Sequence, residues 1–142
     1  MKKARYFRTA LATAILLFCF SGLSSFGQSV SDASFRIIAH FKSDGTIQDT
    51  SYRIIGHIKD DGTIQDGSYK IVGRMRKDGA FQDDSYRTMG FLKDDGMVQD
   101  SSYKILGYIK DDGTVQDSSY RIIRCAKGLP KKWAAYYFFF RK

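Results

Sequence analysis

A pattern of 17 residues fills the chain from Ser34 to about Lys127, and this internal period constrains the fold more than any single residue does. The copy SYRIIGHIKDDGTIQDG at 51–67 returns as SYKILGYIKDDGTVQDS at 102–118, and related copies occupy 34–50, 68–84 and 85–101. A repeat of this length is one supersecondary unit, so the array predicts many packed copies of one small element. Such a pattern specifies scaffold positions and does not by itself specify a chemical activity.

Each copy is expected to form two strands. The stretch 52–59 is rich in β-branched and aromatic residues, 63–66 is a shorter strand, and Lys59-Asp60-Asp61-Gly62 between them is typical of a hairpin turn. A second turn is expected at 66–68. Simple alternation would place the longer strand's residues on two faces, with Tyr52, Ile54, Gly56 and Ile58 on one and Arg53, Ile55, His57 and Lys59 on the other.

One strand position holds only small residues, which predicts a place where strands crowd towards an axis. The residues at this position are Ala39, Gly56, Gly73, Gly90 and Gly107.

The array begins and ends in the middle of a unit. Residues 30–34 match the second half of a copy, and residues 120–127 match the first half of another. Pairing these two halves would close a ring and remove both exposed sheet edges. We therefore predict an all-β fold: a closed ring of five or six short β-hairpin repeats at 28–127, followed by a hydrophobic C-terminal tail at 128–142.

The N-terminal residues 1–27 resemble a secretory signal peptide. Four basic residues precede an apolar run at 9–20, which is too short for a helix spanning a bilayer of about 30 Å. Ser25 and Gly27 are small residues that predict cleavage before Gln28, whereas lipidation at Cys19 is disfavoured by the bulky Phe18. The expected location is the periplasm, the outer-membrane surface or the extracellular space. Cys125 would then be the remaining cysteine, and we interpret it as a small residue at the closing seam and not as a catalytic thiol; an intermolecular disulfide is the remaining alternative.

The copies resemble the β-flower proteins, a family of small secreted bacterial proteins described as four-fold or five-fold. The resemblance rests on the repeated Ser-Tyr-basic start, the glycine after the strand core, the Asp-Gly turn and the Gln-Asp end, together with the tail from Ala126 through Trp133 to the aromatic run. It implies a ring of hairpins and an exported bacterial setting. It brings no established activity and no functional residue.

Several repeated columns could be mistaken for chemistry. The Asp-Asp-Gly turns lack the alternating oxygen ligands and the distal Glu of a calcium loop, so aspartate turns explain them better. The Asp column recurs where a carboxylate can accept backbone N–H bonds between units. Its members are Asp49, Asp66, Asp83, Asp100 and Asp117.

The glutamine column leaves two interpretations open. These amides could hydrogen-bond to one another as a structural ladder, which we favour, or they could form a polar ring that grips a ligand. The column consists of Gln48, Gln65, Gln82, Gln99 and Gln116.

The aromatic column could bind sugar or choline, but we expect these rings to pack in the core with their hydroxyls at the rim. Its members are Phe35, Tyr52, Tyr69, Tyr86, Tyr103 and Tyr120. His40 and His57 share a column with Arg74, Phe91 and Tyr108, so a catalytic or metal pair is not expected. We predict no catalytic residue, no metal and no cofactor.

The tail is basic and apolar together. The chain carries a formal net charge of +8, and residues 124–142 contain basic residues but no acidic one. The tail could plug the ring, which we favour, or lie on a membrane surface, with Trp133, Tyr136, Tyr137 and Phe140 as its packing residues. Nucleic acid fits this modest charge poorly.

These patterns predict an exported, non-enzymatic binding or structural module. The partner stays unknown, with an envelope glycan or a membrane surface reached through the tail as candidates. The alternative functions are a hydrolase acting on envelope glycans and a lectin-like glycan-binding module.

Overall fold

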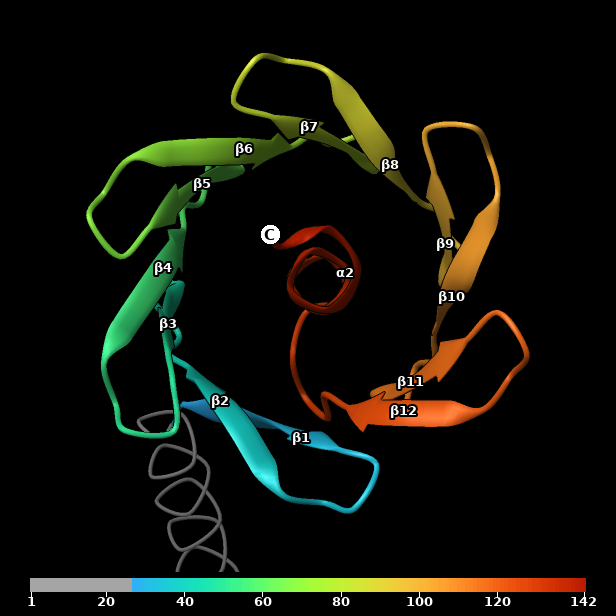
Figure 1. The fold of residues 1–142 in the computed structure, drawn as a ribbon, viewed down its shortest axis with the longest axis horizontal. Coiled ribbons are helices and arrows are strands. Elements are labelled where there is room, and N and C mark those ends of the chain that lie inside the picture. Colours follow the sequence, from blue (N-terminus) through green and yellow to red (C-terminus); the bar gives the residue numbers. More distant parts are fainter. Residues whose placement is uncertain (1–26) are drawn as a thin grey trace, which may run out of the picture.

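Twelve antiparallel strands close into one ring in the computed structural model, which describes residues 27–142 (Figure 1). Strand β1 (Gln28–Asp32) closes the ring by pairing with both β2 (Ile37–Phe41) and β12 (Ile122–Cys125). The predicted all-β closed ring is therefore confirmed, whereas the predicted signal peptide lies outside the described residues except for Gly27. The other strands are β3 (Thr46–Gln48), β4 (Ile54–Ile58), β5 (Thr63–Asp66), β6 (Ile71–Met75), β7 (Ala80–Asp83), β8 (Thr88–Leu92), β9 (Met97–Asp100), β10 (Ile105–Ile109) and β11 (Thr114–Asp117).

The Lys-Asp-Asp-Gly segments form the expected hairpin turns. In the turn between β4 and β5, the Gly62 N–H donates to the Lys59 carbonyl at 3.0 Å, and the Thr63 N–H donates to Asp61 Oδ1 at 2.9 Å. Gly62 has a φ of 89°, a conformation that glycine adopts without steric cost. The Gly62 carbonyl accepts the Met75 N–H of β6 at 2.8 Å. Each such turn is therefore also hydrogen-bonded to the long strand of the following unit.

A β-bulge breaks the alternation that the sequence predicts. Opposite β3, Ile47 pairs with Gly56 but Gln48 pairs with Ile54, so Ile55 is an extra residue. The bulge leaves Ile54 46% exposed and lets Ile55 pack against the core. The prediction that Ile54 and Gly56 share a face is therefore wrong, although Gly56 and Ile58 are both buried as expected.

The C-terminal residues lie inside the ring (Figure 1). They form one turn of α-helix, α2 (Lys131–Ala135), which continues into a π-helical turn, η1 (Tyr136–Phe140). The Phe140 ring stacks on Phe81 of β7 with centroids 4.6 Å apart, and Phe41 of β2 contacts both Trp133 and Tyr137. The core is thus shared between ring and tail. Within residues 27–142, neither helical turn has the length and apolar composition of a membrane-crossing helix.

The small-residue column admits close neighbours from two directions. A Cβ added to Gly107 would lie 2.2 Å from the Gln116 carbonyl oxygen and 2.7 Å from the Phe139 ring. A Cβ added to Gly90 would lie 2.2 Å from the Gln99 carbonyl oxygen and 2.5 Å from the Phe140 ring. At these two positions the expected crowding is therefore between a strand, the backbone of its neighbour and the tail, whereas the atoms nearest to Gly56 and Gly73 all belong to the ring.

Ring closure predicts a strong effect of removing the first strand. Deleting residues 28–33 would expose the edges of β2 and β12 and remove Val30, which is fully buried. We expect a loss of several kcal/mol from a total stability on the order of 5–15 kcal/mol, followed by aggregation. Thermal unfolding and light scattering of the variant measure this. Ser29→Ala on the same strand is the control, and an unchanged midpoint for the deletion would contradict closure.

Candidate ligand-binding surface

An aspartate organises each turn that leads from a short strand to the next long strand. In the turn after β3, Asp49 Oδ1 accepts the Ser51 N–H at 2.8 Å and the Arg53 N–H at 3.0 Å. The Asp49 carbonyl also accepts the Tyr52 N–H at 3.0 Å. The same carboxylate bonds recur in all the equivalent turns, so the predicted turn-making role of this column is confirmed.

The turn forces an aromatic residue into a left-handed backbone conformation. Tyr52 has a φ of 63°, which is strained for a bulky side chain and is rare outside glycine, asparagine and aspartate. The expectation that this column packs in the core is wrong, because the turn directs the rings outwards. The five tyrosines are 62–66% exposed and Phe35 is 81% exposed. The residues with this conformation are Phe35, Tyr52, Tyr69, Tyr86, Tyr103 and Tyr120.

Each tyrosine covers a side chain of the preceding long strand. Tyr52 stacks on His40 with ring centroids 4.6 Å apart and an interplanar angle of 10°, and Tyr69 stacks on His57 at 4.5 Å. The remaining pairs are Tyr86 under the Arg74 guanidinium at 4.1 Å, Tyr103 with Phe91 at 5.3 Å and Tyr120 with Tyr108 at 4.7 Å. One face of each ring is thus supported by a neighbour that differs chemically from unit to unit.

Comparison with protein families identifies the architecture. A model described as the 5-fold beta-flower protein matches residues 27–142. The chain belongs to this β-flower family. No curated protein and no solved structure matched the chain.

The seam of this β-flower protein lacks one stacking partner. Cys125 on β12 occupies the column that elsewhere holds His40 or Tyr108, and it pairs with Ser31 of β1. Phe35 is the aromatic residue whose repeat position corresponds to this smaller partner. It has no stacked ring or cation among residues 27–142, in line with its greater exposure. Cys125 is half-buried with a free thiol.

The glutamine column supports the strained turns. Gln48 Nε2 donates to the Tyr52 carbonyl at 3.1 Å, and Gln82 and Gln99 make the same bond to Tyr86 and Tyr103 at 3.3 Å and 3.2 Å. The predicted amide ladder is therefore wrong for these three residues. Cross-strand pairing also places the column beside the stacked side chains, with Gln65 opposite His57 and Gln116 opposite Tyr108.

The predicted tail residues do not join this outer surface. Ala134, Ala135, Tyr136 and Phe140 are buried inside the ring, and Trp133 and Tyr137 pack partly against its core. The Arg141 guanidinium lies over the Tyr137 ring at 5.2 Å.

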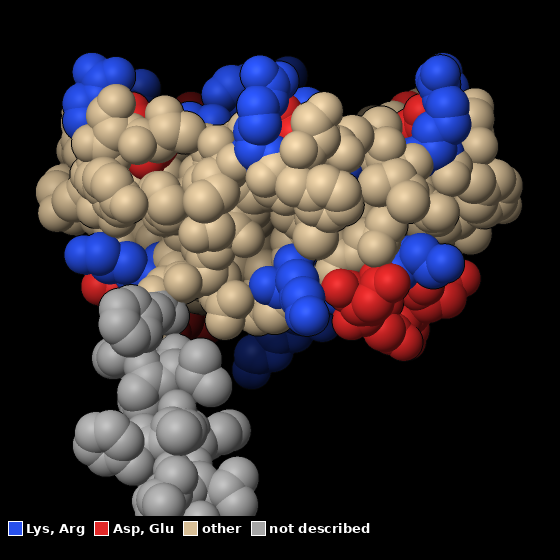
Figure 2. Space-filling model, turned by 90° about the horizontal axis from the view of Figure 1, so that it is seen from below, with Lys and Arg blue, Asp and Glu red and all other residues tan. Residues whose placement is uncertain are grey.

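Basic side chains line the rim that carries the tyrosine turns, seen along the upper edge in Figure 2. Arg53 Nε donates to Asp49 Oδ2 at 3.1 Å, and three other turns have the same ion pair. The four arginine side chains are 80–81% exposed, whereas their aspartates are only 10–24% exposed. The cations therefore form the outer layer. Arg36, Arg53, Lys70, Arg87, Lys104 and Arg121 occupy this position.

The aspartates of the Asp-Gly hairpin turns act as acceptors for turn N–H groups. Asp61 and Asp112 each use Oδ1 to accept the N–H two residues later, as an aspartate turn does. Among residues 27–142, no three His, Cys or acidic side chains are grouped so that they could hold a metal ion. His40 and His57 lie on different strands, each against its own tyrosine.

The turn carboxylates predict how stability depends on pH. The backbone N–H groups of Arg53, Arg87 and Arg121 lower the pKa values of Asp49, Asp83 and Asp117 from their ordinary value of 3.8. A lowered pKa in the folded state stabilises the fold above the unfolded-state pKa, and this contribution is lost as pH falls through the folded-state value. We expect a level melting temperature from about pH 7 to 5 and a steep fall below about pH 4, followed by circular dichroism.

Asp49→Asn keeps an acceptor oxygen but removes the charge, so it should flatten this acidic fall. Asp60→Asn, at an exposed turn position, is the control. An acidic profile unaltered by Asp49→Asn would contradict the assignment.

Phe35 and Tyr120 form a matched pair for measuring the strain. Asparagine tolerates the left-handed conformation, so Phe35→Asn should relieve strain of order 1 kcal/mol and raise the melting temperature. Tyr120→Asn gains the same relief but loses stacking worth about 0.5–1.5 kcal/mol and the 3.1 Å contact between the Tyr120 and Tyr108 hydroxyls. Its stability should stay level or fall. A destabilised Phe35→Asn would show that the exposed ring has a packing role.

Proposed function

We propose that this β-flower protein is an exported, non-enzymatic module that binds carbohydrate through the aromatic rings on its outer wall. The observation that carries the proposal is that bulky, exposed aromatic residues occupy strained backbone positions in every equivalent turn. Glycine or asparagine would satisfy these turns without strain. Stacking on one neighbour stabilises each tyrosine ring, yet Phe35 keeps the conformation although residues 27–142 supply no such neighbour, which supports a role in binding.

Carbohydrate suits the chemistry around each ring. The axial C–H groups of a pyranose form an apolar face that packs on an aromatic ring, while its hydroxyls need hydrogen-bond partners. Tyr52 supplies such a ring. The next residue, Arg53, uses Nε for its bond to Asp49, so its Nη groups take no part in that bond and can donate to sugar hydroxyls. The Asp49 and Gln48 bonds hold the turn in place, so the ring needs little ordering when a ligand binds.

Repetition would compensate for weak single sites. We infer that the ring consists of six two-stranded units of 17 residues. Five of these are continuous in the chain, and β12 and β1 together complete the sixth. Six sites on one rigid ring raise the avidity for a polymeric or clustered glycan well above the affinity of one site.

The assignment as non-enzymatic rests on how the carboxylates are used. In every unit the aspartate of the Asp column accepts hydrogen bonds from turn N–H groups. These carboxylates therefore have equivalent environments, whereas an acid–base pair needs two carboxyl groups in different environments. Export rests on the N-terminal sequence at 1–27. An exposed glycan of the cell envelope would be within reach of a protein in that setting.

Retention on isolated peptidoglycan and on a glycan array tests the proposal. We expect the protein from Gln28 to Lys142 to be retained, and retention to fall stepwise as Tyr52, Tyr69 and Tyr86 are replaced by asparagine. Each site lost should lower the avidity several-fold because the sites act together. Melting temperatures establish that the variants fold.

Lys59→Gln combined with Lys93→Gln is the matched control at the opposite rim and should leave retention unchanged. Retention that survives replacement of all five tyrosines and Phe35 would overturn the proposal. Absence of retention on every glycan tested would overturn it as well.

A further inference from the structure

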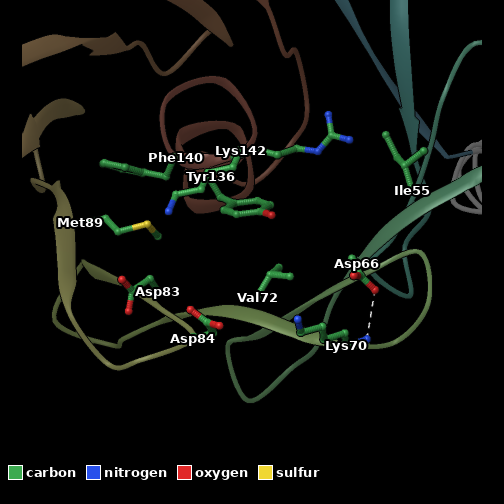
Figure 3. Close-up of a pocket in the computed structure, with 11 residues that line it drawn as sticks. Ile55, Asp66, Lys70, Val72, Asp83, Asp84, Met89, Tyr136, Phe140 and Lys142 are labelled. Carbon is green, nitrogen blue, oxygen red and sulfur yellow. Dashed lines mark hydrogen bonds between the residues drawn. The ribbon is translucent and has the colours of Figure 1, made fainter.

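A cavity of about 380 Å³ opens at the rim of the tyrosine turns, between the tail and one side of the ring (Figure 3). Its floor is apolar, with Val72 and Met89 from the ring and Tyr136 and Phe140 from the tail. Its mouth carries both signs of charge. The charged residues are Asp66, Lys70, Asp83, Asp84, Arg141 and Lys142.

The cavity exists because one helical segment cannot fill a symmetrical ring evenly. The tail contacts the ring unevenly, and its closest approaches to the glycine column are those of Phe140 to Gly90 and Phe139 to Gly107. On the cavity side, the atoms nearest to the Cβ position of Gly56 belong to Gln65 and Ile47 of the ring. The floor is therefore left open beside β4 and β6.

Residues that depart from the repeat meet at this cavity. Asp84 is the only carboxylate at its repeat position, where the other units have Ala33, Thr50, Gly67, Ser101 and Ser118. Val72 is the smallest residue in a column that otherwise contains Ile38, Ile55, Met89, Leu106 and Ile123. The first change adds a charge at the mouth, and the second enlarges the space at the floor.

From this juxtaposition we infer a single binding site for a small amphiphile with a zwitterionic head group. Figure 3 shows Asp83 and Asp84 on the ring side of the opening and Lys142 on the tail side. Asp66 and Asp83 use Oδ1 for turn N–H bonds, whereas Asp84 forms no hydrogen bond or ion pair within residues 27–142. A cationic group would pair with Asp84, an anionic group with Lys142 or Arg141, and a short alkyl chain would cover Val72 and Met89. The volume lies within the roughly 300–1,000 Å³ typical of ligand pockets.

This site is separate from the aromatic rings of the outer wall, so the two proposals fail independently. Octylphosphocholine, kept below the concentration at which it forms micelles, is the probe for the cavity. Calorimetric titration of the protein from Gln28 to Lys142 should show one site, and NMR should show the Met89 methyl signal shifting on titration. Octyl glucoside, octyl sulfate and octyltrimethylammonium have the same chain with an uncharged, anionic or cationic head, and each should bind more weakly.

Two substitutions use residues that equivalent units already accommodate, so folding should be preserved. Asp84→Ser removes the ion pair between the carboxylate and the quaternary ammonium, so it should weaken octylphosphocholine binding about tenfold and leave octyl glucoside binding unaffected. Val72→Ile fills the floor of the cavity and should weaken the binding of both probes several-fold. Ser118→Asp, at the same repeat position but away from the cavity, should change neither.

No binding of octylphosphocholine would overturn the inference. Equal binding of all four head groups, or binding that Asp84→Ser leaves unchanged, would overturn the zwitterionic selectivity and with it the assigned ligand class.

Discussion

The hydrogen bonds of one aspartate per turn determine both the shape of the ring and the surface it presents. Each carboxylate accepts two backbone N–H groups, which fixes the path of the chain from a short strand to the next long strand. That path requires a left-handed residue and puts it at the outer wall, where a tyrosine stacks on the strand before it. The bulge at Ile55 begins immediately after the same turn, so the burial pattern of the long strand also follows from this local geometry.

The sequence was sufficient to predict the repeat-derived features of the fold. The 17-residue period, the Asp-Gly turns and the half-units at the two ends predicted a closed all-β ring, because turn chemistry and unpaired edges are local properties. The sequence was insufficient to predict which residues of the long strand face the core and which face solvent. Simple alternation assumes that the two strands pair without interruption. The bulge instead adds Ile55 between Ile54 and Gly56, so Ile54 is exposed although alternation places it on the same face as the buried Gly56.

The outer surface was mispredicted for a related reason. Tyr52 was expected in the core because large aromatic residues are usually buried, but a φ of 63° turns its ring outwards. Gln48 was expected to bond to other glutamines, yet its Nε2 donates to the Tyr52 carbonyl of the same strained turn. A usable signal was present: the invariant spacing from Asp49 to Tyr52 places the aromatic residue inside an aspartate turn, where left-handed conformations are common.

Repetition and departure from repetition have different consequences in this ring. Residues that recur, such as the turn aspartates and the tyrosines, can only produce equivalent sites around the wall, which suits a ligand that is itself repeated. The tail occurs once and lies inside the ring, so it makes the sides of the ring unequal and leaves space beside Val72 while closing it beside Gly107. A selective site for a small molecule therefore requires the tail, whereas a multivalent surface requires only the repeat. The unrepeated Asp84 lies where the tail has created that difference, and this placement separates the proposed small-molecule site from the proposed sites on the tyrosine turns.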